Sequence, residues 1–119
     1  MGTTSFTQLD VYKKTITLTQ DVYRITAYFP RDQVYVLSAQ MQRAALSIGA
    51  NIAEGYGRRT PKDKAHFYTI SKGSGEELLH YLVVSEVLGY FKGSPEVTQR
   101  ANDVCGMLRR LADRTLELG

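Results

Sequence analysis

The sequence lacks the residues on which several kinds of protein depend. It has a single cysteine, Cys105, which excludes an internal disulfide and is expected to act as a small apolar filler on its helix. No apolar run approaches the length of a membrane span, and the N-terminal segment MGTTSFTQLDVYKK contains no apolar stretch typical of signal peptides. Phe6 occupies the position where a myristoylation signal requires serine or threonine. We therefore expect a cytoplasmic protein with no membrane partner.

Few residues are present that could carry metal or nucleophilic chemistry. Glu77 with His80 and Asp63 with His66 have the spacing of helical metal ligands. Both pairs fall on one predicted helix, about 21 Å apart at the standard rise, and no third histidine exists to complete either site. Gly73-Ser74-Gly75 is neither a nucleophile elbow nor a phosphate-binding loop, because no strand precedes it. We expect no metal, no cofactor and no catalytic residues.

The remaining residues favour an all-α fold. Length predicts a single domain, residues 1–119, and no segment has the period of a strand. Helices are predicted over about 8–28, 33–54, 61–88 and 95–118. The three prolines lie at the boundaries, and Asp32 can cap the second helix. Short connections between four amphipathic helices predict an antiparallel up-down four-helix bundle.

Apolar periodicity assigns a buried face to each helix. On the second helix this face includes Asn51, whose amide is expected to find a hydrogen-bond partner on a neighbouring helix. The face predicted for the first helix is Leu9, Tyr12, Ile16, Tyr23 and Ala27. That of the second is Leu37, Met41, Ala44, Ile48, Asn51 and Gly55, and that of the last is Val97, Ala101, Val104, Leu108, Leu111 and Leu118.

Glycines and small polar residues mark the predicted turn between the second and third helices. Gly55 and Gly57 can adopt the left-handed conformation, so we expect them to end the second helix. Thr60 can cap the third helix, Pro61 suits its first position, and Asp63 can complete a capping box.

Two glycines inside the third helix, Gly73 and Gly75, have two explanations. Each glycine weakens a helix by about 1 kcal/mol relative to alanine. They either allow another helix to approach closely or mark a bend. Close approach is favoured, because the apolar stripe continues in phase through them.

Up-down topology gathers positive charge at one end of the bundle. Residues 10–14, 54–64 and 109–117 meet there and contain nine basic and five acidic residues, a net charge of +4. The segments at the opposite end, 21–32 and 86–103, have four basic and five acidic residues, a net charge of −1. Such polarity is typical of a phosphate-binding surface, and Tyr56 offers a stacking surface beside it. The predicted nucleic-acid-binding residues are Arg58, Arg59, Lys62, Lys64, Arg109, Arg110 and Arg114.

One alternative is enzymatic. Arg59 and His66 have a spacing that resembles the short Arg-x(4–6)-His signature of HEPN-type helical ribonucleases. Another alternative is a ring that only scaffolds other proteins, with the basic end incidental.

Longer motifs point to a family. They are Phe29-Pro30 with Tyr35 and Leu37, Gln40 with Arg43-Ala44-Ala45, Ser47-Ile48-x-x-Asn51-Ile52-Ala53-Glu54-Gly55 with a following arginine, and Gly73-Ser74-x-x-Glu77-Leu78. Over about Phe6 to Phe91 the chain resembles the four-helix bundle family encoded by 23S rRNA intervening sequences. That family includes the accessory variability determinants of diversity-generating retroelements.

The resemblance implies a cyclic homopentamer with a basic surface. For the retroelement branch it also implies binding to nucleic acid and to a reverse transcriptase. It gives the motif residues a structural role, in which Asn51, Glu54, Ser74 and Glu77 form a hydrogen-bonded set with Arg43 or Arg58. The structural motif residues are Arg43, Ser47, Asn51, Glu54, Gly55, Gly73, Ser74 and Glu77. The leading hypothesis is a non-enzymatic, homo-oligomeric bundle that binds RNA or DNA through its basic end.

Overall fold

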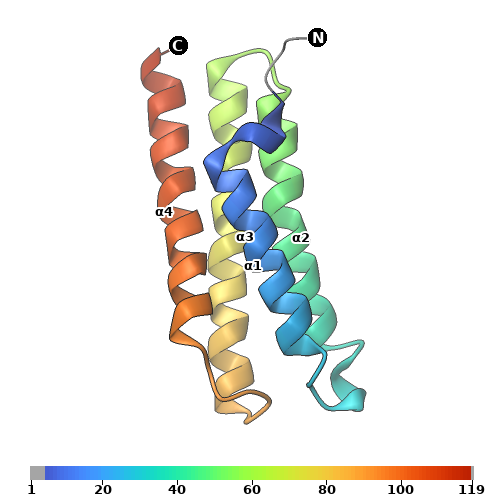
Figure 1. Cartoon of the computed structure of the whole chain (residues 1–119). Coiled ribbons are helices and arrows are strands. Elements are labelled where there is room, and N and C mark those ends of the chain that lie inside the picture. The colour runs from blue at the N-terminus through green and yellow to red at the C-terminus, as the bar shows by residue number, and fades with distance from the viewer. Residues whose placement is uncertain (1–4, 119) are drawn as a thin grey trace.

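Four antiparallel helices form the structure (Figure 1). The computed structural model describes residues 5–118, which contain no strand. The helices are α1 (Asp10–Thr26), α2 (Leu37–Tyr56), α3 (Pro61–Val87) and α4 (Pro95–Leu118), and short 3-10 turns occupy Phe6–Gln8 and Arg31–Gln33. The expected all-α, four-helix architecture is confirmed.

Capping residues fix the starts of α3, as expected, and of α4. The Thr60 hydroxyl accepts a hydrogen bond from the backbone N–H of Asp63 at 3.1 Å, and Ser94 accepts one from Val97 at 3.3 Å. Proline follows each capping residue at the first helical position, where its missing N–H costs nothing. These local signals depend only on neighbouring residues, which is why the sequence locates them.

The start of α2 differs from the prediction. The helix begins at Leu37 rather than near residue 33, and Asp32 does not cap it, because no side chain caps its first turn. The backbone N–H of Gln33 bonds to the carbonyl of Pro30 at 2.9 Å, closing a 3-10 turn. A 3-10 turn winds the backbone more tightly than an α-helix does. It occupies residues just before and within the predicted first turn of α2, so the α-helix starts about one turn later.

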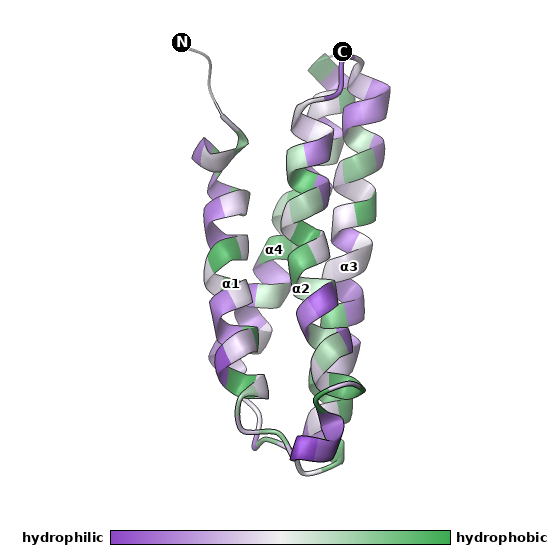
Figure 2. Ribbon diagram, turned by 90° about the vertical axis from the view of Figure 1, so that its right-hand side faces the viewer, coloured by the Kyte–Doolittle hydropathy of each residue, from purple (hydrophilic) through white to green (hydrophobic). Residues whose placement is uncertain are grey.

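Each helix contributes one face to a common core. In Figure 2 hydrophobic and hydrophilic residues alternate along the helices, as expected when one face is buried and the other exposed. On α4 the predicted seam is buried from Val97 to Leu108, whereas Leu118 is 82% exposed beyond it. The core comprises Val11, Leu18, Val22, Phe29, Leu37, Met41, Ala44, Ala45, Ile48, Ile52, Leu78, Leu82, Val97, Ala101, Val104 and Leu108.

The face predicted for α1 is wrong at Ile16, Tyr23 and Ala27, whereas Leu9 and Tyr12 pack against the core as predicted. Ile16 and Tyr23 are 41% and 43% exposed, and the buried positions of the helix include Thr15 and Asp21. Thr15 can be buried because its hydroxyl donates to the carbonyl of Val11 at 2.8 Å. Such a bond satisfies the polar group within the helix, so threonine behaves as an apolar side chain here. An exposed apolar strip consequently remains along α1.

Gly57 ends α2 as predicted, but neither it nor Gly55 adopts the left-handed conformation. Gly57 has φ −83°, and the positive φ values among the described glycines are at Gly89 and Gly93, in the α3–α4 connection. Gly55 is buried inside α2, where a Cβ atom would lie 2.9 Å from Cε1 of Tyr68. It therefore serves close approach of α2 and α3 rather than a left-handed cap.

The two glycines of α3 also have separate roles. The helix continues from Pro61 to Val87, so the glycines do not break it. A Cβ on Gly75 would lie 2.7 Å from Sγ of Cys105 on α4, which confirms close packing there. A Cβ on Gly73 would have no neighbouring atom within 4 Å. Only Gly75 is explained by packing within the chain.

Candidate nucleic-acid interface

The basic stretches of the sequence meet at one end of the bundle. The α2–α3 turn, the start of α1 and the end of α4 lie together there (Figure 1). Ala65 and Tyr68 of α3 form a small core cluster with Ala112 of α4, which holds the two helices together at this level. We call this the basic end, defined by Arg58, Arg59, Lys62, Lys64, Arg109, Arg110 and Arg114. Lys64 is half-buried, and the others are exposed.

Two of the seven cations hold the α2–α3 turn. The Lys64 ammonium donates to the carbonyl of Tyr56 at 2.6 Å and lies 5.4 Å from the centre of its ring. It thereby satisfies a carbonyl at the C-terminus of α2. Arg58 pairs with Glu54 at 2.7 Å, and its guanidinium lies 4.5 Å from the centre of the Phe67 ring. Because these groups already have partners, they have less capacity to bind a ligand.

The other five cations have no ion-pair partner within residues 5–118. Gly106 provides room for Arg110, since a Cβ at this glycine would lie 3.3 Å from Nη1 of the guanidinium. Exposed cations without an internal partner can bind an external anion without first breaking a contact. The unpaired set is Arg59, Lys62, Arg109, Arg110 and Arg114.

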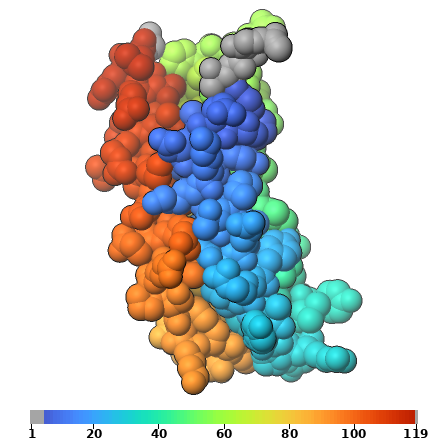
Figure 3. Space-filling view, in the orientation of Figure 1, coloured from blue at the N-terminus to red at the C-terminus, as the bar shows by residue number. Residues whose placement is uncertain are grey.

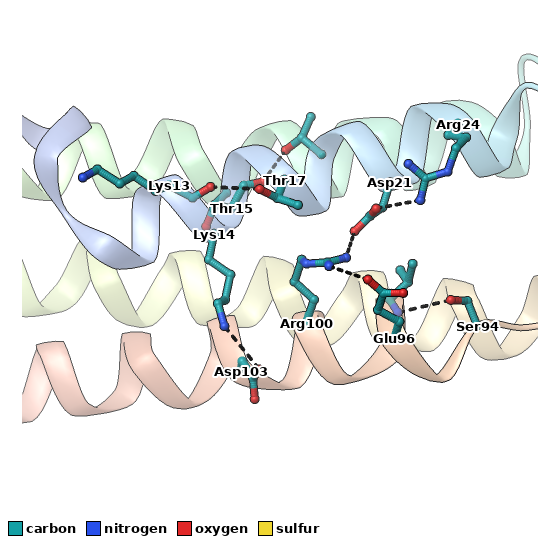
Figure 4. A network of polar contacts seen from close by, with 12 residues as sticks. Lys13, Lys14, Thr15, Thr17, Asp21, Arg24, Ser94, Glu96, Arg100 and Asp103 are labelled. Carbon is teal, nitrogen blue, oxygen red and sulfur yellow. Dashed lines mark hydrogen bonds and ion pairs between the residues drawn. The ribbon is translucent and has the colours of Figure 1, made fainter.

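Charges farther from the basic end neutralise one another (Figure 4). Arg100 of α4 donates to Asp21 of α1 and, at 3.0 Å, to Glu96. Burial alone would lower the pKa of Arg100, but its bonds to these two carboxylates raise it. Lys14 pairs with Asp103 at 3.4 Å. The hydrogen bond from Gln99, together with Lys14, lowers the pKa of Asp103. The α1–α4 interface is thus held by paired charges, in contrast to the basic end.

The motif residues form a shorter network than expected. The hydroxyls of Ser47 on α2 and Ser74 on α3 lie 2.9 Å apart in a hydrogen bond between the helices. Asn51 donates to the carbonyl and the hydroxyl of Ser47, at 2.9 and 3.1 Å. Its amide is therefore satisfied by its own helix, not by a neighbouring one, and it reaches α3 only through Ser47.

The charged motif residues are not joined to this network. Glu54 pairs with Arg58 on the surface of α2. Arg43 and Glu77 are exposed and take part in no ion pair within the described chain. Gly73 faces open space on α3. The structure therefore unites Ser47, Asn51 and Ser74, and leaves Arg43 and Glu77 available to another molecule.

The Arg59 and His66 pair has no enclosed site. Arg59 lies in the α2–α3 turn, and His66 is exposed on α3 with its ring 5.5 Å from that of Phe67. Neither residue lines the groove between α1 and α4 or the one between α1 and α2. The ribonuclease hypothesis gains no geometric support from this placement and stays untested.

Other reactive groups are equally isolated. Residues 5–118 contain no cluster of three His, Cys, Asp or Glu side chains able to hold a metal ion. Burial raises the pKa of the Cys105 thiol, which keeps it protonated and unreactive.

One feature of the basic end was missed from the sequence. A groove of about 290 Å³ runs between α1 and α4 and is lined by Leu9, Asp10, Val11, Met107, Arg110, Leu111 and Arg114. The signal in the sequence lies on α4, where Met107 and Leu111 are four residues apart, as are Arg110 and Arg114. The residues that α1 contributes to the groove could be identified only once the fold was known.

No helix of the described chain has both the length and the apolar character needed to cross a membrane.

No curated protein matches the sequence. Among solved structures, the 1.70 Å crystal structure of a protein of unknown function from the S23 ribosomal protein family of Bacteroides thetaiotaomicron is similar. It shares 21% identity at a TM-score of 0.68, covering 86% of this chain and 94% of that chain. At this identity the similarity establishes the fold alone.

The sequence also matches a family model described as 23S rRNA-intervening sequence protein, over residues 7–110. The match extends from the 3-10 turn before α1 to Arg110 in α4 and so includes most of the bundle. The chain belongs to the 23S rRNA-intervening sequence protein family.

Proposed function

We propose that this chain is a non-enzymatic, homo-oligomeric helical bundle that binds RNA or DNA through its basic end. The observation that carries the proposal is the set of exposed cations at that end that form no ion pair within residues 5–118: Arg59, Lys62, Arg109, Arg110 and Arg114.

Nucleic acid is the polyanion that this surface fits best. Its phosphates repeat at short intervals, so several cations spread over one end of a bundle can be engaged together. Phosphate contacts carry little sequence information, so we expect weak sequence preference.

Self-association is the second part of the proposal, with a cyclic pentamer as the expected assembly. Apolar side chains are left exposed between α1 and α2, where Ile16 and Leu46 are 41% and 53% exposed. These two residues line a shallow groove with Tyr12, Gly49 and Ala50. A contiguous exposed apolar patch is typical of a protein interface. A ring would place several basic ends on one assembly and strengthen binding to a polyanion.

If the chain belongs to the retroelement branch of its family, the expected protein partner is a reverse transcriptase.

The test of nucleic-acid binding compares two variants of equal charge. Arg59→Ala/Arg109→Ala removes two cations from the basic end. Arg31→Ala/Lys92→Ala removes two exposed cations from the opposite end, neither of which forms an ion pair in the part of the chain that the structure describes. Fluorescence anisotropy with a labelled structured RNA and a labelled duplex DNA measures the affinity of each. We expect the first variant to bind roughly tenfold more weakly and the second to bind as the unmodified protein does.

Equal losses of affinity in both variants would mean that net charge alone governs binding, and the basic end would not be the site.

Light scattering tests self-association separately. Ile16→Glu should convert the oligomer to a monomer, whereas Tyr28→Glu, at an 83% exposed position near the opposite end of the bundle, should not. A monomeric unmodified protein would refute self-association.

A further inference from the structure

The groove between α1 and α4 combines an apolar floor with a charged rim. Figure 3 shows the start of α1 lying directly against the C-terminal half of α4 on one face of the molecule. Leu9, Met107 and Leu111 are only partly buried there, although they pack against the core. Arg110 and Arg114 lie one helical turn apart along the α4 side. Apolar surface is therefore left open within reach of two guanidinium groups.

The two sides of the groove carry opposite charge. Asp10 belongs to the first turn of α1, whereas Arg110 and Arg114 are exposed and form no ion pair within residues 5–118. Among the residues that line the groove, Asp10 would repel a phosphate, whereas Arg110 and Arg114 would attract one. A ligand with an anionic part and a flat apolar part would accordingly bind in one orientation, with the anion toward α4.

We propose that the groove accepts an unstacked base of a single-stranded nucleic acid, while Arg110 and Arg114 bind the adjacent phosphates. This inference rests on the proposed function and narrows its substrate to single strands or loops. A duplex keeps its bases stacked inside and presents phosphates on a convex surface, so it would leave the apolar floor uncovered. A single strand presents both groups together, and its bases bind apolar and arginine-lined surfaces with little dependence on sequence.

The experiment measures anisotropy for three labelled ligands of equal length at one salt concentration: a single strand, its duplex, and a strand of abasic sugar-phosphate units. We expect the intact single strand to bind roughly tenfold more tightly than the abasic strand. The duplex should gain nothing from the groove. Equal affinity for the intact and abasic strands would overturn the base-binding groove while leaving phosphate binding by the basic end intact. Absence of binding to all three would overturn both proposals.

A matched pair of variants assigns the effect to the groove. Met107→Gln replaces a partly buried floor residue by a polar one of similar length, and Leu116→Gln changes a 52% exposed residue of the same helix outside the groove. Met107→Gln should reduce the preference for the intact strand at least threefold without changing affinity for the abasic strand, and Leu116→Gln should alter neither. Circular dichroism verifies that both fold. If Met107→Gln changed the mass measured by light scattering but not the base preference, a second copy would cover the groove and the inference would be wrong.

Discussion

Arg100 of α4 donates a hydrogen bond to the carboxylate of Asp21 on the inner face of α1. Asp21 is 4% exposed and also accepts a bond from Arg24 at 2.7 Å. A buried carboxylate without a partner is strongly unfavourable, so the position of α1 against α4 depends on Arg100, the partner from the other helix (Figure 4).

The two arginines that bind Asp21 should contribute unequally to stability. Arg100→Ala leaves the buried carboxylate with one partner whose side chain is 62% exposed, and should lower the free energy of unfolding by about 3 kcal/mol. Arg24→Ala should lower it by less than about 1 kcal/mol, as expected for a solvent-exposed partner. Urea denaturation measures both. Equal effects would contradict the primary role of Arg100.

The two glycines of α3 give opposite predictions for the same substitution. Gly75→Ala places a Cβ against Sγ of Cys105 and should destabilise the protein by about 1–3 kcal/mol. Adding Cys105→Ala should recover part of this loss. Gly73→Ala meets no neighbour and should stabilise the helix by about 0.5–1 kcal/mol. Thermal denaturation measures the stability of both variants. A stability that changes in the same direction for Gly73→Ala and Gly75→Ala would refute the separate roles of the two glycines.

Two buried serines allow a similar comparison. Ser71 donates to the carbonyl of Ile48 at 2.7 Å, linking α3 to α2. The hydroxyl of Ser38 is buried with no hydrogen-bond partner in the described chain. Ser71→Ala should therefore cost about 1 kcal/mol, whereas Ser38→Ala should be neutral or stabilising by up to about 1 kcal/mol. A larger loss at Ser38 than at Ser71, measured by urea denaturation, would disprove this assignment.

Cys105 should make stability fall at alkaline pH. Burial raises the pKa of its thiol in the folded state. The unfolded chain releases the proton once the pH exceeds about 8.5, while the folded chain retains it, so its contribution is fully present below that pH and is lost above it. Unfolding free energies from pH 7 to 10 should decline more steeply for the unmodified protein than for Cys105→Ala. Parallel curves would show that the thiol titrates normally.

Local signals made most of the fold predictable. Thr60 with Pro61 and Ser94 with Pro95 start helices because caps need only adjacent residues, whereas the later start of α2 depends on the 3-10 turn after Pro30. On α1, Asp21 was not placed on the buried face, because its burial depends on Arg100 of a distant helix. Periodicity alone cannot reveal such a partner.

The candidate site was predictable in position but not in detail. Topology alone brings the basic segments together at one end. Which cations already have partners depends on the three-dimensional structure, since Lys64 binds the carbonyl of Tyr56 at the end of α2 and Arg58 pairs with Glu54. The groove beside Arg110 also depends on the docking of α1, which contributes Leu9, Asp10 and Val11, and Val11 was not on the face predicted for that helix.

Salt dependence of the affinity for single-stranded RNA tests the role of the basic end most directly. If its cations displace counterions from phosphates, log affinity falls linearly with log salt, and Arg114→Ala makes the slope shallower by about 0.7. Arg31→Ala, at the opposite end, should leave the slope unchanged. An affinity that is constant between about 50 and 200 mM salt, or equal slopes for Arg114→Ala and the unmodified protein, would contradict phosphate binding by this surface.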